Sequence, residues 1–344
     1  MMDLHLLALA TVSVLVAMLA SMLATGFMVD YARRRGMLDH PGQRRSHTMP
    51  TPRGGGLGLT MGAALGMAPV LVFTQPALLT VVFLAALFLV ALIGWMDDHR
   101  DLPAWPRLAI HLVAALLFCV PLILMTGWLL WWLAPLVLAA AWSINLHNFM
   151  DGSDGMLGVQ LVFVGLLSAG LCTLQGWPDL AMLNLGLSAA ATGFLAFNLP
   201  PARIFMGDVG SGSAGLLVFM LAALWCREDI AALWPILIVH AVFMTDAGMT
   251  LAARMLRGKR WYTAHREHLY QWLVRSGFSH GRTGWLYLIY NLAIVAPLAW
   301  LAAREPSIGL WLCVAAYALT MIVWWSARRF CLRRVARRAS RAPA

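Results

Sequence analysis

Oxygen-bearing side chains gather in the segment NLHNFMDGSDGM, residues 145–156. The segment supplies amide and carboxylate oxygens, the ligands that Ca²⁺ and Mg²⁺ prefer, from four side chains: Asn145, Asn148, Asp151 and Asp154. It resembles the start of a calcium-binding EF-hand loop, but Met156 stands where that loop needs a glutamate. Calcium sensing is therefore disfavoured, while another binding role for these oxygens remains open.

A further carboxylate, Asp208, lies among glycines in the segment FMGDVGSGS. Gly207, Gly210 and Gly212 would let the backbone approach a ligand closely, and the N–H groups that open the next apolar run favour an anion. Proteins usually hold Mg²⁺ with a carboxylate together with phosphate oxygens. The motif alone leaves a plain loop turn as the alternative.

Two adjacent carboxylates, Asp97 and Asp98, end another apolar run. Neighbouring carboxylates repel, and near a bilayer they are costly unless a cation or a basic group offsets them. Arg107 opens the next apolar run and could reach back to these acids or to a phosphate. The alternative is that the acids merely terminate a helix.

A fourth polar motif is HREH, formed by His265, Arg266, Glu267 and His268. Its spacing differs from the HExxH motif of zinc proteases, so these side chains are better read as donors to a sugar or a phosphate. The residues that follow place Leu269, Trp272 and Leu273 on one helical face, with Gly277 as a stop. We therefore predict a short interfacial helix after the motif.

Two other features narrow the choice of chemistry. The segment PTPRGGG, residues 50–56, lacks the GK[ST] of a Walker loop, so ATP hydrolysis is not indicated. Asp246 lies within an apolar run, where an acid must face the bundle interior or a cavity. Both a functional role and a structural hydrogen bond remain open for it.

The elements that position these groups follow from the composition. Hydrophobic residues make up 61% of the 344 positions and charged residues only 12%, against roughly 25% charged in soluble domains. Several uninterrupted runs reach the roughly 20 apolar residues that a helix needs to cross a bilayer. Because these runs lack the alternation of barrel strands, we predict an all-α polytopic membrane protein.

Hydropathy predicts about eleven spans. Their ranges are 4–28, 55–74, 77–96, 107–123, 125–144, 156–175, 180–198, 211–226, 231–251, 284–303 and 307–327. No positive region precedes the first run and three arginines follow it, so we expect a retained helix with the N-terminus outside. We also expect one membrane domain over residues 1–327 and a basic cytoplasmic tail over 328–344.

Charge supports this orientation. If the N-terminus is outside, all lysines and arginines except Arg227 and Arg304 fall on the cytoplasmic side, with the C-terminus there too, as the positive-inside rule requires. The net charge of +10 is then explained by topology and by contact with anionic membrane lipids, without nucleic acid. The acidic and histidine-bearing motifs also gather on this face.

In this order the motifs resemble those of the polyprenyl-phosphate N-acetylhexosamine-1-phosphate transferases, glycosyltransferase family 4. This superfamily includes the phospho-muramoyl-pentapeptide translocase and the enzymes that initiate O-antigen. The matching motifs are DD with Arg107, NxxNxxDGxDG from Asn145 to Gly155, GDxGS from Gly207 to Ser211, and a histidine-bearing last cytoplasmic loop. The resemblance spans residues 39–283.

The resemblance implies roles for individual residues. Asn148 and Asp208 would bind Mg²⁺, with Mn²⁺ as an alternative, and a nucleotide diphosphate would complete the coordination. Asp97, with Asp98 beside it, would act on the acceptor phosphate as a base or as an orienting group. The expected catalytic residues are Asp97, Asp98, Arg107, Asp151, Asp154, His265, Arg266 and His268. The expected substrate-binding residues are Arg44, His47, Arg53, Arg107, Asn145, Asp151, Asp154, His265, Arg266 and His268.

Two positions depart from the family pattern. HREH differs from the contiguous histidines of the peptidoglycan enzyme and from the HIHH type, and is closer to the O-antigen branch. His111 stands where many members have glutamine, which leaves its role open.

The function implied is transfer of a sugar 1-phosphate, from a UDP-linked N-acetylhexosamine or N-acetylated 6-deoxyhexose, to undecaprenyl phosphate with release of UMP. The site would face the cytoplasm at a bacterial inner membrane, and a homodimer is an allowed assembly. One alternative is a lipid-carrier transporter or flippase, which predicts ionisable residues at mid-depth and an inverted repeat. Another is a phosphatase or glycosyltransferase acting on the same carrier.

Overall fold

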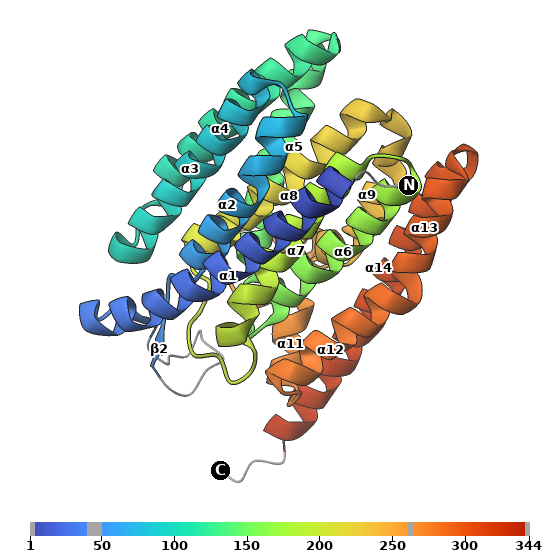
Figure 1. The fold of residues 1–344 in the computed structure, drawn as a ribbon. Coiled ribbons are helices and arrows are strands. Elements are labelled where there is room, and N and C mark those ends of the chain that lie inside the picture. Colours follow the sequence, from blue (N-terminus) through green and yellow to red (C-terminus); the bar gives the residue numbers. More distant parts are fainter. Residues whose placement is uncertain (1–3, 40–49, 261–264, 341–344) are drawn as a thin grey trace.

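The computed structural model describes residues 4–39, 50–260 and 265–340, which form a bundle of helices (Figure 1). The α-helices are α1 (Leu4–Arg35), α2 (Gly56–Thr74), α3 (Ala77–Arg100), α4 (Ala104–Thr126), α5 (Leu133–Met150), α6 (Met156–Leu174), α7 (Pro178–Asn198), α8 (Asp208–Glu228), α9 (Leu233–Val239), α10 (Ala241–Met255), α11 (Leu269–Arg275), α12 (His280–Tyr290), α13 (Ala296–Arg304) and α14 (Gly309–Ala339). The short elements are the strands β1 (Leu38–Asp39) and β2 (Thr51–Pro52), the 3₁₀ turns η1 (Leu130–Trp132), η2 (Ile230–Ala232) and η4 (Pro306–Ile308), and the π-helical η3 (Asn291–Val295).

Most of the helices are long enough to cross a membrane. Within the described ranges, ten helical segments are long and apolar enough to cross a membrane, and α9 with α10 makes an eleventh if the pair is one bent span. The prediction of an all-α polytopic membrane protein with about eleven spans is therefore confirmed. The short helix expected after HREH is also present, as α11.

Several spans differ from their expected form. The first continues to Arg35 instead of ending at 28, and the fifth, α5, covers Leu133–Met150 instead of 125–144. The ninth is broken, because α9 and α10 meet at His240 at an angle of 70°. The last helix, α14, continues to Ala339, well past the expected end at 327. Hydropathy falls after 327, but the sequence from there to Ala339 contains no glycine or proline and is rich in the helix formers alanine, leucine and arginine. The basic residues of this stretch therefore continue the helix.

Helix α8 is almost completely buried and packs against α3, α5 and α2. Where α2 and α8 begin, Gly56 lies directly against Gly210, so a β carbon on either residue would overlap the other's backbone. Glycines also bring α2 close to α1 along a row of small residues, a mode common in membrane bundles: Gly58, Gly62 and Gly66. These contacts fix the first turn of α8 within the bundle.

The polar motifs meet at one end of the bundle. The end of α3, the start of α4, the end of α5 and the start of α8 lie in mutual contact there. Figure 1 shows β2 and α11 at the lower end of the bundle, with α14 projecting beyond it. The pairing of Leu38 with Pro52 and of Asp39 with Thr51 joins the segment after α1 to the segment before α2.

Candidate active site

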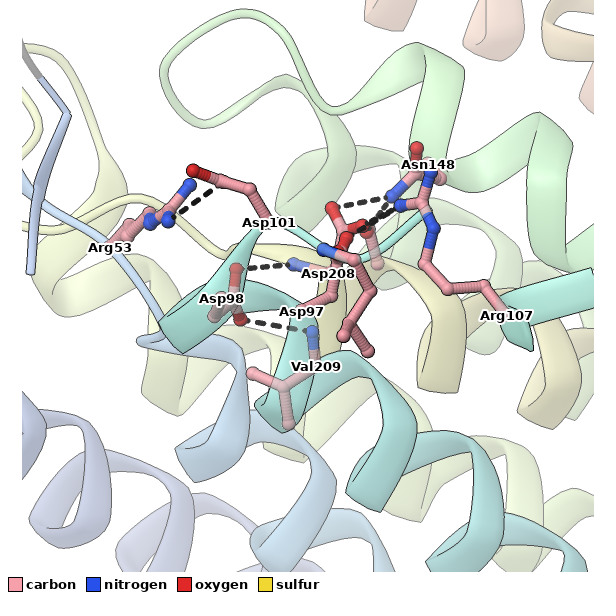
Figure 2. Close-up of polar contacts among 10 residues, drawn as sticks. Arg53, Asp97, Asp98, Asp101, Arg107, Asn148, Asp208 and Val209 are labelled. Carbon is pink, nitrogen blue, oxygen red and sulfur yellow. Dashed lines mark hydrogen bonds and ion pairs between the residues drawn. The ribbon is translucent and has the colours of Figure 1, made fainter. Parts of the chain in front are cut away.

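Asp98 holds the first turn of α8. Its carboxylate accepts the backbone N–H groups of Asp208 at 3.0 Å and Val209 at 3.1 Å (Figure 2). These N–H groups have no partner within their own helix, and the helix dipole favours an anion at that end. Gly207 precedes them at a φ of +75°, and a β carbon there would lie 2.6 Å from an Asp98 oxygen. Only glycine fits this turn.

Arg107 joins two carboxylates that lie far apart in the chain. Its Nη1 donates to Asp97 Oδ2 at 2.6 Å and also contacts Asp208 Oδ2 (Figure 2). Asp97 is fixed from the other side by the backbone N–H of Leu102 at 2.5 Å. The guanidinium therefore offsets the repulsion between Asp97 and Asp208.

Asn148, in the last turn of α5, approaches Asp208 from a different direction. Its side-chain amide donates to Asp208 Oδ1 at 2.8 Å and to the Ser211 hydroxyl at 3.1 Å. Asn145, one turn earlier, instead donates to the backbone carbonyl of Ala141. The structure thus gives Asn148 a hydrogen bond to Asp208 and gives Asn145 a backbone partner instead.

A polar cavity of about 280 Å³ opens beside this cluster. It is lined by Asp39, Arg53, Asp98, Asn148, Asp151, Gly152, Ser153, Asp154, Asn198, Phe205, Gly207, Asp208, Arg266, Tyr270, Gln271 and Val274. Several of these residues were not predicted from the sequence: Asp39, Asn198, Phe205, Tyr270 and Gln271. Asn198 had one available signal, because it is a polar residue at the end of a predicted span. We call this space the large cavity.

A second cavity of about 70 Å³ lies on the other side of Asp208 and Asn148. Its walls include Arg107, His111 and Asn145. Arg107 Nε and His111 Nδ1 are both buried without a hydrogen-bond partner among the described residues. Arg107 supplies the one cationic side chain among the residues that line this cavity, and a cationic wall favours an anion. We call this space the small cavity.

Asp151 and Asp154 enter the large cavity from the loop between α5 and α6. Burial, together with the nearby carboxylates of Asp208 and Asp98, raises the pKa of Asp151 well above its usual value. Asp154 is tied to its surroundings by the backbone N–H of Ala202, which donates to it at 3.1 Å. The loop therefore presents two carboxylates with different environments.

The HREH motif is divided by the fold. Arg266 lines the large cavity, whereas His265 and His268 do not. Glu267 turns away and pairs with Arg254 at 2.5 Å and with two other cations, Arg257 and Lys259. Burial, with smaller effects of His268 and Arg254, lowers the pKa of His265 to about 4. At neutral pH this imidazole is therefore an uncharged hydrogen-bonding group.

The remaining predicted residues are placed as follows. Arg53 lines the large cavity and pairs with Asp101 at 3.1 Å. Arg44 and His47 lie outside the described residues. The roles assigned to all these side chains stay predictions, because position alone does not test them.

The oxygen atoms around Asp208 that could bind a metal suit a cation that takes few protein ligands. Among the described residues, no three His, Cys, Asp or Glu side chains gather into a self-sufficient metal site. Mg²⁺ keeps several waters and combines one or two protein oxygens with phosphate. Asp208 supplies a carboxylate at the cavity wall, and a half-turn of the Asn148 amide would present its oxygen beside it. This pair fits Mg²⁺ bound together with a diphosphate.

Comparison with known proteins identifies the family. The profile of glycosyl transferase family 4 matches residues 80–226, which contain the cluster around Asp208. A decaprenyl-phosphate N-acetylglucosaminephosphotransferase of Mycolicibacterium smegmatis is 31% identical over 322 residues, covering 80% of this chain and 77% of that protein. The chain belongs to glycosyl transferase family 4. The resemblance inferred from the motifs is thereby confirmed.

Other relatives in glycosyl transferase family 4 also align over most of their length. A probable undecaprenyl-phosphate N-acetylglucosaminyl 1-phosphate transferase of Bacillus subtilis is 27% identical and covers 87% of this chain and 86% of its own. An undecaprenyl-phosphate alpha-N-acetylglucosaminyl 1-phosphate transferase of Escherichia coli (strain K12) is 26% identical, covering 92% and 91%. The names of these relatives all specify a polyprenyl phosphate and N-acetylglucosamine.

Proposed function

We propose that the protein transfers N-acetylglucosamine 1-phosphate from UDP-N-acetylglucosamine to undecaprenyl phosphate, releases UMP, and so initiates O-antigen or another envelope polysaccharide. One observation carries the proposal: Arg107, Asn148 and Asp208, from three different helices, meet between a large polar cavity and a small one. The family and the substrates named for its members support it.

The reaction exchanges one phosphate bond for another. An oxygen of the lipid phosphate bonds to the phosphorus that carries the sugar, and the bond from that phosphorus to the bridging oxygen breaks. The electron pair leaves with UMP. Because a phosphate is already ionised near neutral pH, catalysis depends on alignment and on charge compensation more than on a strong base.

The two cavities suggest where each substrate binds. The large cavity has room and polar walls for the sugar nucleotide, with Asp151, Asp154 and Arg266 along it. The small cavity would hold the acceptor phosphate beside the side chains of Arg107 and His111, which line it. Asp97, fixed by Arg107, would then orient the acceptor rather than remove a proton from it.

We further propose that activity depends on Mg²⁺. Asp208 and Asn148 would hold the ion beside the diphosphate, and Mn²⁺ could take the same ligands. When bound, the ion would offset charge on the diphosphate. Asp98 would contribute by holding the backbone of Asp208 and Val209 in place.

The setting of the site is also part of the proposal. We place the protein in a bacterial inner membrane with its N-terminus outside, its active site and C-terminus on the cytoplasmic face, and its basic residues against anionic lipids. Residues 1–327 would form one catalytic domain, with residues 328–344 as its basic extension. A homodimer stays a prediction.

Product analysis tests the proposed reaction. Purified protein in detergent would receive UDP-N-acetylglucosamine labelled in the sugar, undecaprenyl phosphate and Mg²⁺. We expect the label in a lipid product and UMP in the aqueous phase. Release of UDP would indicate transfer of the sugar alone. The absence of any lipid product would contradict the proposed reaction. Parallel reactions with other UDP-linked amino sugars test the choice of donor.

A further inference from the structure

Asp246 is a carboxylate buried within the helix bundle at a distance from the reacting groups. It lies in α10, is 1% exposed, and belongs to the walls of neither the large nor the small cavity. A buried charge is strongly unfavourable unless hydrogen-bond donors surround it. Its neighbours therefore indicate its role.

Hydrogen-bond donors from four helices surround the two Asp246 oxygens. The donors are the backbone N–H of Leu269 (2.7 Å), the backbone N–H of Tyr270 (3.4 Å), the hydroxyl of Thr250 (3.4 Å), the hydroxyl of Tyr287 (2.7 Å) and the indole N–H of Trp324 (3.0 Å). The side chains come from α10, α12 and α14, and the two backbone groups open α11. Asp246 thus joins α11 to three other helices.

Helix α11 depends on such an anchor. It has seven residues, and a helix this short does not hold its shape in isolation. Its first N–H groups lack partners within the helix, and Asp246 accepts two of them. A negative charge at this end also matches the helix dipole.

The opposite side of α11 forms a wall of the large cavity. Tyr270, Gln271 and Val274 line that cavity. The Tyr270 hydroxyl donates to the backbone carbonyl of Phe149 at 3.1 Å, and the Gln271 amide donates to the same hydroxyl at 3.1 Å. A β carbon on Gly152 would overlap the Tyr270 hydroxyl, so this wall touches the loop that carries Asp151. A shift of α11 would therefore change the shape of the cavity.

We propose that Asp246 is a positioning residue that fixes α11 as one wall of the sugar-nucleotide cavity. The inference rests on the proposed function, because it assigns the large cavity to the donor substrate. Asp246 reaches the large cavity through α11, so its loss should weaken donor binding more than it changes the acceptor site around Arg107.

The variant Asp246→Asn tests this separation. It keeps the shape but removes the charge and turns one acceptor into a donor facing N–H or O–H groups. We expect KM for UDP-N-acetylglucosamine to rise about tenfold, as when charge-assisted hydrogen bonds are lost, with kcat and KM for undecaprenyl phosphate nearly unchanged. Tyr287→Phe is the matched control, because it removes one bond to Asp246 and leaves both bonds to α11. We expect it to leave the donor KM unchanged.

Two results would overturn the inference: an unchanged donor KM in Asp246→Asn, or an equal rise in Asp246→Asn and Tyr287→Phe. Hydrogen–deuterium exchange without substrates gives a readout that does not need activity. We expect residues 269–275 to exchange faster in Asp246→Asn and the rest of the bundle to stay protected. If the wild-type protein transfers no sugar phosphate, the proposed function fails, while exchange in α11 still tests the anchor.

A second variant covers the case in which Asp246→Asn does not fold. Asp246→Glu keeps the charge but moves it outward by one methylene. We expect KM for the donor to rise and α11 to exchange faster, as in Asp246→Asn. Both changes should be smaller than in Asp246→Asn, because the charge is kept. Unchanged values in a folded Asp246→Glu protein would likewise contradict the anchoring role.

Discussion

The guanidinium of Arg107 contacts the carboxylate of Asp208 although 101 positions separate them in the chain. The same nitrogen lies 2.6 Å from Asp97. One cation thus joins the start of α4, the end of α3 and the start of α8. Two acids that would otherwise repel can therefore lie close together, with Asp208 lining both cavities.

Loss of Arg107 should affect the acceptor substrate most. We expect Arg107→Ala to lower kcat/KM for undecaprenyl phosphate by about 100-fold or more, since it removes the cation proposed to bind the acceptor phosphate and exposes the two carboxylates to each other. Arg107→Lys keeps the charge and should recover part of the loss. Steady-state rates at varied lipid concentration check this, and a change in Arg107→Ala of less than about threefold would contradict it.

Asn148 should set the response to Mg²⁺. We expect Asn148→Ala to raise the Mg²⁺ concentration for half-maximal rate about tenfold, and Asp208→Ala to abolish transfer, because these side chains are the proposed ligands. Asn145→Ala is the matched control, since Asn145 lies on the same helix but donates to Ala141 instead of Asp208. A Mg²⁺ titration that gives the same midpoint for both asparagine variants would remove Asn148 from the metal site.

Gly207 should tolerate no side chain. Gly207→Ala combines a backbone at φ +75° and ψ 175°, a region that essentially only glycine adopts, with overlap between the new β carbon and Asp98. Gly127 has a similar φ of +68° but open space around it, so Gly127→Ala carries only the backbone strain, roughly 1–2 kcal/mol. We expect Gly207→Ala to lower the melting temperature further and to abolish transfer. Equal melting temperatures for the two folded variants would show that the Asp98 contact is unimportant.

The pH dependence of stability should include a contribution from His265. Its pKa is about 4 in the folded protein, whereas the ordinary value for histidine, which applies to the unfolded chain, is 6.5. Between these two pH values the unfolded chain therefore binds a proton that the folded chain does not. Folding free energy is therefore lost as pH falls through this window. We expect His265→Gln to lose less thermal stability than the wild type between about pH 7.5 and about pH 5. Identical losses would contradict the lowered pKa.

The sequence predicts the spans because their apolar runs are long and uninterrupted. It does not predict the break at His240, since no glycine or proline marks that point. The sequence also does not predict that Asp97 and Asp98 have different partners. Successive residues of a helix point in different directions, and only packing shows that Asp98 meets α8 while Asp97 meets Arg107.

The predicted site residues came from motifs with several polar groups, and this limits what could be found. Tyr270 and Phe205 are single aromatic residues beside polar motifs, and their residue types alone do not distinguish them from packing residues. Both residues line the large cavity because α11 and the segment before α8 lie beside the loop between α5 and α6. Asn145 and Asn148 show the reverse case, since one motif contains both and only Asn148 reaches Asp208.

The glycine pair at the start of α2 and α8 has a consequence for mutational scanning. Gly56 and Gly210 lie backbone against backbone, and Gly210 is two residues from Asp208. Any substitution would force the two helix starts apart and carry Asp208 with them. A survey that scores only product formation would rank both glycines with the carboxylates proposed to act in catalysis, although neither glycine lines a cavity beside Asp208.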